Sequence, residues 1–372
     1  MLCVVSFVIL LFASIVSRKY RKLLGKAWHC VSRRARLKPC DTSFGAEVKT
    51  TLLAPLAIRA PRLVKPLSVI IEIFAWVMMI SMIVTVYILL RSGLNLAVHG
   101  TCNPRQPEAC GLAAASCGIS AEIPTFSQSL REGAILTAFQ NEFTQFTETV
   151  QAVPNLFRNW NPEEFLPAYA SFKHGFHEEL PIALEVIDPG CWVCGQMFIN
   201  LAESGFDAQV NLAYIPFAIL DEETGDPHFP NSVRITNILT ALRIFEYEKF
   251  DGVVDNPTDW LLLNEIFTGT RPGTDIGHQM WFNNADWATP SVMDAQLVEW
   301  LESFGTLSEI EIVEVFELAD SERVQEVVND SRHVVRHEIR TATIPTLLTP
   351  GRMSNGLVEI DRLIRFGERL TD

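Results

Sequence analysis

Cys191 and Cys194 stand three positions apart in the stretch DPGCWVCGQMFIN. A pair at this spacing supports three kinds of chemistry. It can open and close as a redox couple, supply half of a four-ligand zinc site, or remain closed as a structural disulfide. The elements around the pair discriminate between these possibilities.

The pair lies between a short apolar run and a helical pattern. We predict a buried strand at 182–187 (IALEVI), a helix at 193–205 and a second strand at 210–220. This βαβ unit places Cys191 at the helix N-terminus, where unpaired backbone N–H groups and the helix dipole favour a thiolate. Cys194 comes one turn inside the helix and is expected to be the more buried of the two. The arrangement favours a dithiol that opens and closes.

Two further residues make the sequence resemble the thioredoxin superfamily. Members carry a buried acid six residues before the first active-site cysteine, and Glu185 has this spacing. They also carry a cis-proline that faces the dithiol, and Pro345 in TATIPTLLTPGR follows an apolar residue and precedes a predicted strand. An X-Pro bond reaches the cis form for only ~0.5–1 kcal/mol. The resemblance covers about 181–220 and 336–372.

The long interval between these two parts narrows the resemblance to DsbA-like members, which carry a helical insertion at this place. The resemblance implies an α/β, thioredoxin-like fold over 181–372 with a large helical insertion at about 221–335. The sequence departs from the family at Gly190, where a Trp commonly precedes the first cysteine. Between the cysteines, Trp192 and Val193 offer no His to stabilise the thiolate, which argues against an extreme oxidising potential.

The resemblance also implies a function and a role for each site residue. The chain would be a thiol:disulfide oxidoreductase, of oxidase, reductase or isomerase type, that needs no cofactor; its apolar N-terminal stretches, and not the resemblance, predict that it is membrane-anchored. Cys191 would form a mixed disulfide with a client protein and Cys194 would resolve it. Glu185 would accept the proton of Cys194 through a water molecule, and Pro345 would align the client backbone beside the dithiol. The expected partners are clients with thiols or disulfides, a membrane redox partner and the lipid bilayer, but no nucleic acid.

Two other functions remain open. A copper or zinc site of the metallochaperone kind would need further ligands, which the pairs His174/His177 and His333/His337 could supply. A non-enzymatic membrane scaffold would keep the cysteine pair as a permanent disulfide, although a bond at a helix start is open to reductants. Hydrolase and phosphate-loop chemistry has no support, because the sequence contains neither a G-x-S-x-G motif nor a Walker-type glycine-rich motif.

Two apolar stretches flank a basic segment near the N-terminus. Residues 2–17 carry no charge, residues 67–90 carry only Glu72, and residues 18–65 hold thirteen Lys and Arg against two acids. As a helix, the second stretch spans about 36 Å, more than the ~30 Å hydrocarbon core. The first is predicted to be a retained anchor rather than a cleaved signal peptide, because its positive charges follow the apolar run. The formal net charge of −14 argues against nucleic acid as a partner.

These stretches predict the order of the domains. Transmembrane helices at 1–17 and 67–91 flank a basic cytoplasmic loop at 18–66. An extracytoplasmic, cysteine-containing linker and helical region follows at 92–180, and then the thioredoxin-like domain. The positive-inside rule places the N-terminus and the C-terminal domain outside the cytoplasm of a two-pass cell-membrane protein. Disulfides persist in that compartment.

Three cysteines, Cys102, Cys110 and Cys117, lie in a loop rich in Pro, Gly and Ala. Because three is an odd number, one thiol is left over after any local pairing. We predict a structural disulfide between Cys102 and Cys110, with Cys117 free or bonded to a partner. The alternative is a relay that passes electrons to another dithiol. Further on, Phe residues at helical spacing in 126–150 predict an amphipathic helix with an aromatic face in the core.

Overall fold

The described residues of this computed structural model are 64–104, 133–221 and 224–371, together with 106–107, 110–111, 114–119 and the single positions 25, 28, 129 and 131. The chain divides between Leu90 and Arg91, and residues 91–372 form one compact unit. The segment 92–180, expected as a separate linker and helical region, is part of this unit. The predicted helix at 1–17 and nearly all of the basic loop lie outside the described residues.

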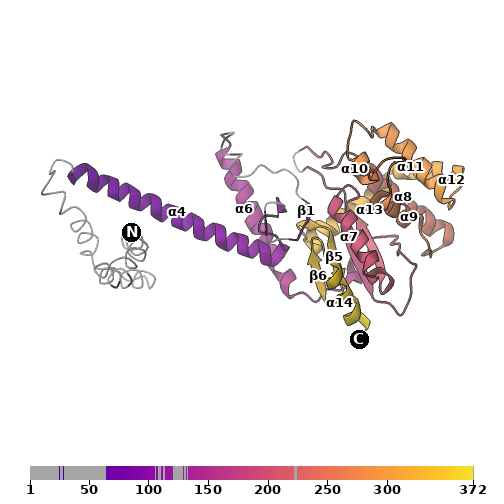
Figure 1. Ribbon diagram of the computed structural model, residues 1–372, viewed down its shortest axis with the longest axis horizontal. Helices are drawn as coiled ribbons and strands as arrows, with labels where there is room; N and C mark the ends of the chain where they lie inside the picture. Colours follow the sequence, from indigo (N-terminus) through magenta and orange to yellow (C-terminus); the bar gives the residue numbers. More distant parts are fainter. Residues whose placement is uncertain are drawn as a thin grey trace. The chain divides into compact units, whose positions relative to one another are not determined.

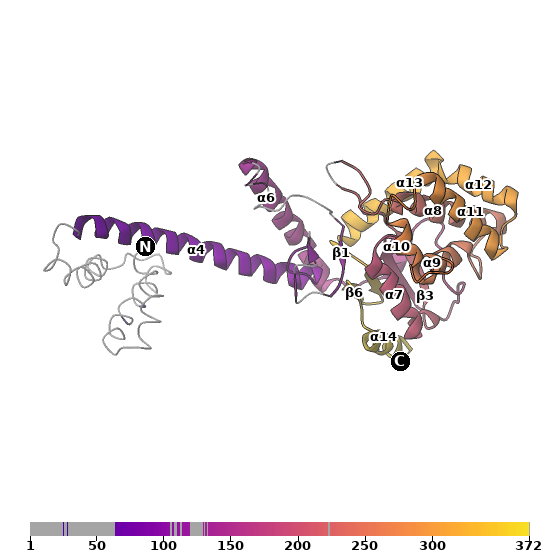
Figure 2. The same ribbon diagram turned by 45° about the horizontal axis from the view of Figure 1, so that its top comes forward.

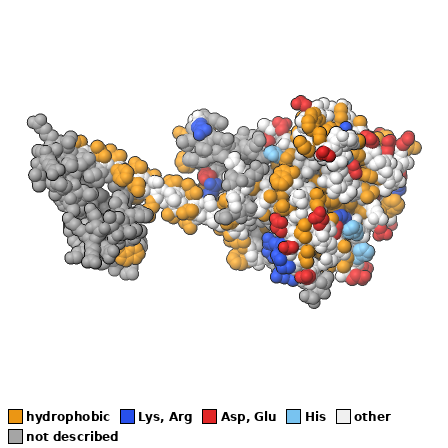
Figure 3. All heavy atoms as spheres, in the orientation of Figure 1, with side chains coloured by type: hydrophobic (Ala, Val, Ile, Leu, Met, Phe, Trp, Pro, Cys, Tyr) orange, Lys and Arg blue, Asp and Glu red, His pale blue; other side chains and the backbone are white. Residues whose placement is uncertain are grey.

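One long helix, α4 (Val64–His99), contains the second predicted membrane span. Its stretch Trp76–His99 is, within the described part of the chain, the one helix that is long and apolar enough to cross a membrane. Many of its apolar side chains are exposed, among them Leu89 at 66% and Leu90 at 71% (Figure 3). The helix was predicted to end at residue 91, but it continues to His99.

A four-stranded sheet in the order β3-β2-β5-β6 forms the centre of the 91–372 unit (Figure 1). β2 (Ile182–Ile187) and β3 (Asn211–Pro216) are parallel, and every residue of both strands is buried. β5 (Thr346–Thr349) runs antiparallel to β2, and β6 (Arg352–Asn355) runs antiparallel to β5. Burial on both faces of the sheet explains why IALEVI is apolar at every position except Glu185.

The helices complete a thioredoxin-like order of elements. α7 (Trp192–Glu203) connects β2 to β3, and α14 (Ile360–Thr371) follows β6 and contacts α7. Between β3 and β5 the chain is almost entirely helical, and these helices gather into one group (Figures 1 and 2). They are α8 (Ser232–Phe250), α9 (Thr258–Thr268), α10 (His278–Phe282), α11 (Pro290–Phe304), α12 (Glu309–Ala319), α13 (Glu322–His333) and the π-helix η6 (Val334–Ile339).

The segment before β2 adds short elements to this fold. They are the two-residue strand β1 (Cys117–Gly118), α6 (Ile135–Ala152) and the 3-10 helices η3 (Val153–Phe157) and η4 (Pro162–Phe165). A further 3-10 helix, η5 (Phe206–Ala208), follows α7. β1 pairs with β4 (Thr343–Ile344) in a separate two-stranded sheet. This pairing places β1, which comes early in the sequence, next to the chain just before β5.

The prediction that the aromatic face of the 126–150 helix lies in the core is wrong. On α6, Phe139 is 60% and Phe143 is 69% exposed, whereas the small and polar side chains on the other face are buried. Among these, Thr149 donates a hydrogen bond of 2.8 Å to Asn95 in the last turns of α4. Helical spacing identified the amphipathic helix but not which face is covered, because the neighbouring helix presents polar groups.

Candidate active site

Cys191 lies at the start of α7, as the sequence predicted. It is the N-cap residue, with extended backbone angles of φ −77° and ψ 114°. Its carbonyl accepts the backbone N–H of Cys194 at 2.9 Å, which closes the first turn of the helix. The Cys191 sulfur is therefore held where the N-terminal N–H groups of a twelve-residue helix favour negative charge.

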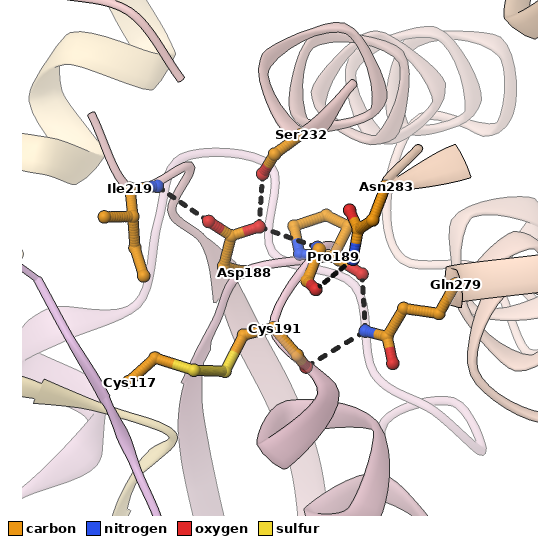
Figure 4. Close-up of a disulfide and its surroundings, with 9 residues drawn as sticks. Cys117, Asp188, Pro189, Cys191, Ile219, Ser232, Gln279 and Asn283 are labelled. Carbon is orange, nitrogen blue, oxygen red and sulfur yellow. Dashed lines mark hydrogen bonds between the residues drawn. A yellow bond between two sulfur atoms is a disulfide. The ribbon is translucent and has the colours of Figure 1, made fainter. Parts of the chain in front are cut away.

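The disulfide at this position does not join the two cysteines of the motif. Cys191 is bonded to Cys117, 74 residues earlier, with an S–S distance of 2.08 Å (Figure 4). Cys194 is a free, buried thiol. The expectation that Cys117 is left free or bonds another protein is therefore wrong. The reason is tertiary, since the pairing of β1 with β4 places Cys117 opposite Ile344. Separately, Cys102 and Cys110 form a disulfide with a Cα–Cα distance of 5.7 Å.

Pro345 is brought to the site between β4 and β5. The Ile344–Pro345 peptide bond is cis, and the carbonyl of Pro345 accepts the N–H of Gly356 at 2.8 Å. Because the residue before it pairs with Cys117, Pro345 lies directly beside the strand that carries the disulfide.

Glu185 is a buried acid in the middle of β2, only 1% exposed. Burial raises its pKa to about 8, and the positive charge of Lys173 acts in the opposite direction. Its Oε1 has no hydrogen-bond partner among the described residues. Burial also raises the pKa of the Cys194 thiol well above its usual range, and the negative charge of Glu185 adds to this rise. The carboxyl and the thiol are thus both fully buried, and the charge of Glu185 acts on the Cys194 thiol.

Asp188 is a site residue that the sequence analysis missed. It is fully buried, and its carboxylate accepts hydrogen bonds from the N–H of Gly190 and the N–H of Ile219, both at 2.7 Å, and from the hydroxyl of Ser232 (Figure 4). Burial raises its pKa to about 6, and these hydrogen bonds oppose the rise. Asp188 connects the end of β2 to the chain after β3 and to the start of α8. The Asp-Pro-Gly turn signal marked the position but not its partners.

Two amide side chains from the helical insertion hold the loop that precedes Cys191. Gln279 Nε2 donates to the carbonyl of Pro189 at 2.7 Å and to the carbonyl of Cys191 at 2.9 Å. Asn283 Nδ2 donates to the carbonyl of Gly190 at 2.7 Å (Figure 4). No local signal could reveal these contacts, because the amides lie about ninety residues away in sequence.

The structure also explains Gly190, the departure from the family pattern. A Cβ atom added at Gly190 would lie 2.3 Å from Cβ of Phe229 and 2.5 Å from its Cγ. The Phe229 side chain therefore fills the space that a larger residue would need. Trp192, by contrast, is 57% exposed on the first turn of α7.

The described residues do not assemble a metal site around the cysteines. No three His, Cys, Asp or Glu side chains among them are grouped in a way that suits a metal ion. His174 instead lies 3.5 Å from the carboxylate of Asp207, and the His333 and His337 rings contact each other at 4.8 Å between centroids. Neither histidine pair joins Cys194 in a ligand set in the part of the chain that the structure describes.

No protein family matches the sequence, and no curated protein matches it either. Solved structures with a similar fold include the thiol-disulfide exchange protein alpha-DsbA2 from Wolbachia pipientis, at 14% identity over 54% of this chain and 87% of that one, with a TM-score of 0.37. A thioredoxin-like oxidoreductase from Silicibacter pomeroyi DSS-3 has 14% identity over 55% and 93%, with a TM-score of 0.35. The catalytic domain of Proteus mirabilis ScsC has 10% identity over 57% and 96%, with a TM-score of 0.35. These likenesses concern the fold alone.

Proposed function

We propose that the chain is a membrane-anchored thiol:disulfide oxidoreductase that exchanges disulfides with extracytoplasmic client proteins. The observation that carries the proposal is the state of its three sulfurs. Cys191, at the start of α7, forms a disulfide with Cys117 on β1, while Cys194, one turn further on, is a free thiol. These are the two components of thiol–disulfide exchange, a mixed-disulfide position and a resolving thiol.

The exchange follows from this arrangement. In the reducing direction, the Cys191 thiolate attacks a client disulfide, which forms a mixed disulfide and releases one client thiolate. Cys194 then loses its proton to Glu185 and attacks the Cys191 sulfur, so that the Cys191–Cys194 disulfide forms and the second client thiolate leaves. The helix N-terminus stabilises Cys191 both as attacking and as leaving thiolate. The oxidising direction is the reverse, and no cofactor takes part.

Trapping of clients tests this proposal. The variants need Cys117→Ser as a background, because Cys117 otherwise holds Cys191. With Cys194→Ser added, client proteins are expected to remain on Cys191 as adducts that reductants dissolve, since the resolving thiol is missing. With Cys191→Ser added instead, no adducts are expected. Non-reducing electrophoresis of the full-length protein from its membrane reads out both. Equal behaviour of the two variants would refute the assigned roles, and absence of adducts from both would refute the enzymatic function.

The proposed topology has its own test. A membrane-impermeant maleimide, added to intact cells after reduction, should label a variant that retains Cys191 as its only cysteine. It should spare variants that retain only Cys30 or only Cys40, because the positive-inside rule places the basic segment in the cytoplasm. Labelling is read by mass spectrometry of the purified protein. The opposite pattern would show that the catalytic unit faces the cytoplasm.

A further inference from the structure

The strand that carries Cys117 is bound to the active site by its backbone as well as by its sulfur. We call residues 114–119 the Cys117 strand. Cys117 pairs with Ile344 and Gly118 with Thr343 in antiparallel register. The N–H of Ile119 donates to the carbonyl of Ala342 at 3.1 Å. The Cys117 strand thus pairs with the backbone of β4, and recognition of a peptide by strand addition likewise depends on the backbone more than on side chains.

A second backbone segment holds the same strand from its other end. The N–H of Leu357 donates to the carbonyl of Ala115 at 2.8 Å. Beside it, Gly356 has φ +75°, and a Cβ atom there would lie 2.9 Å from the carbonyl oxygen of Ala115. The turn after β6 therefore leaves room for a peptide backbone at this place. Residues 342–344 on one side and 356–357 on the other make a short cradle for an extended peptide.

The Cys117 strand also closes the site. With the strand in place, Cys191 has no exposed surface, and Cys194 has none either. A client cysteine cannot reach the Cys191 sulfur in this state. The strand has the position, the backbone pairing and the disulfide that a bound client peptide would have.

We propose that Cys117 is a third redox cysteine, an internal exchange partner whose strand occupies the place of the client peptide. The proposal rests on the proposed function, because it assigns the resting occupant of the same exchange site. The site then alternates between a covered form, with the Cys117–Cys191 disulfide, and an open form, with the Cys191–Cys194 disulfide. The clients of the open form are extended segments with a cysteine, recognised through their backbone by residues 342–344 and 356–357.

The change between the two forms needs no outside oxidant or reductant. The Cys194 thiol gives its proton to Glu185, and its thiolate attacks the Cys191 sulfur. The Cys117–Cys191 bond breaks as the Cys191–Cys194 bond forms, and the Cys117 thiolate leaves and takes up a proton. One disulfide is present before and after, so the redox state of the protein is unchanged. The strand, no longer bonded, is then free to give way to a client.

Disulfide mapping of the full-length protein in detergent micelles tests this exchange. The protein is held in glutathione buffers of graded potential, acid-quenched, alkylated and digested, and the linked peptides are quantified by mass spectrometry. Both the Cys117–Cys191 and the Cys191–Cys194 peptides are expected, the second always together with alkylated Cys117. Cys194→Ser should retain only the first. The proposal is overturned if Cys117 and Cys191 become free together and the Cys191–Cys194 peptide never forms.

Access of a client to the site gives an independent measurement. Cys117 is tethered to the site, so it competes with a client for Cys191 at an effective concentration in the millimolar range. Cys117→Ser should therefore accelerate exchange with a micromolar fluorescent cysteine peptide by about 10- to 100-fold. The matched control is Ser291→Ala at an exposed position on α11, outside the Cys117 strand and its cradle, and it should react like the parent. Equal rates for Cys117→Ser and the parent would overturn the occupancy of the client site.

The two proposals fail in different ways. If mapping shows the internal exchange but no peptide or client ever reacts at Cys191, the oxidoreductase function fails and Cys117 remains an internal redox partner. The role of Cys117 fails, and the oxidoreductase function stands, on two other results. Clients would exchange at the same rate with and without Cys117, and the Cys191–Cys194 disulfide would form only after the Cys117–Cys191 disulfide had first been reduced by glutathione.

Discussion

Replacement of Glu185 by Gln is expected to slow the resolution of a mixed disulfide on Cys191 by about 100-fold near pH 8, because proton transfer to a positioned group contributes at least that much. The Cys194 thiol is fully buried and has its pKa raised well above the usual range, so it ionises only if a neighbouring group takes its proton. Glu185, with its pKa raised to about 8, is the buried carboxyl whose charge acts most on the thiol, and Asp188 acts in the same direction to a smaller extent.

The dependence on pH identifies Glu185 as that base. Its carboxyl accepts a proton only when ionised, so the resolution rate of the parent should rise as pH approaches about 8 and then level off. Glu185→Gln should lose this step. The rate is measured as release of a labelled peptide from Cys191 in a Cys117→Ser background, where only Cys194 can release it. Glu179→Gln, which removes the same charge from an exposed position, is the control and should be unchanged. A persistent step near pH 8 in Glu185→Gln would assign the base elsewhere.

Glu185→Gln should slow the exchange but raise the free energy of unfolding. A carboxyl whose folded-state pKa is raised stabilises the fold below its unfolded pKa, and this contribution is lost as pH rises through about 8. Glu185→Gln removes the buried charge and should gain roughly 2–5 kcal/mol relative to the parent between pH 5 and pH 9, since each tenfold change in acidity corresponds to ~1.4 kcal/mol. Urea unfolding at the two pH values measures the gain. A slower enzyme that is more stable cannot be explained by loss of the fold.

Gly190→Ala is expected to destabilise the unit by about 3 kcal/mol, the upper part of the range for overpacking. The added methyl group would meet three atoms of Phe229 at 2.3, 2.5 and 2.8 Å, so either the ring or the loop must move. Movement of the loop would also disturb the hydrogen bond from Asn283 to the carbonyl of Gly190. Exchange at Cys191 should therefore slow together with the loss of stability.

A double-mutant cycle separates the clash from other effects. Adding Phe229→Ala to Gly190→Ala removes the atoms in the way, so the pair should be more stable than the sum of the single changes indicates. Gly277→Ala serves as the matched control, because a Cβ there meets only the carbonyl of Gly269 at 3.9 Å. Urea unfolding measures the parent, the two single variants, the double variant and the control. Strict additivity would show that Phe229 is not what restricts position 190.

Local sequence determined the elements that carry the chemistry. Period and flanking residues predicted the strand at 182–187, which is β2, and the helix from residue 193, which is α7 with Cys191 as its N-cap. These elements depend on neighbours within a few residues, so a short window of sequence contains the information. The choice of Glu185 and Pro345 as site residues came instead from the resemblance to the thioredoxin superfamily, whose pattern these two positions match.

Only the tertiary structure decided which groups meet. The partner of Cys191 is Cys117, because backbone pairing of β1 with β4 brings together segments that are far apart in the chain. Gln279 supports the loop before Cys191 from a helix in the insertion, and polar contacts with α4 leave Phe143 of α6 exposed. Cysteine spacing limits which pairs can close but does not select one. The choice depends on which backbones pack together, and that is settled by the free energy of the whole unit.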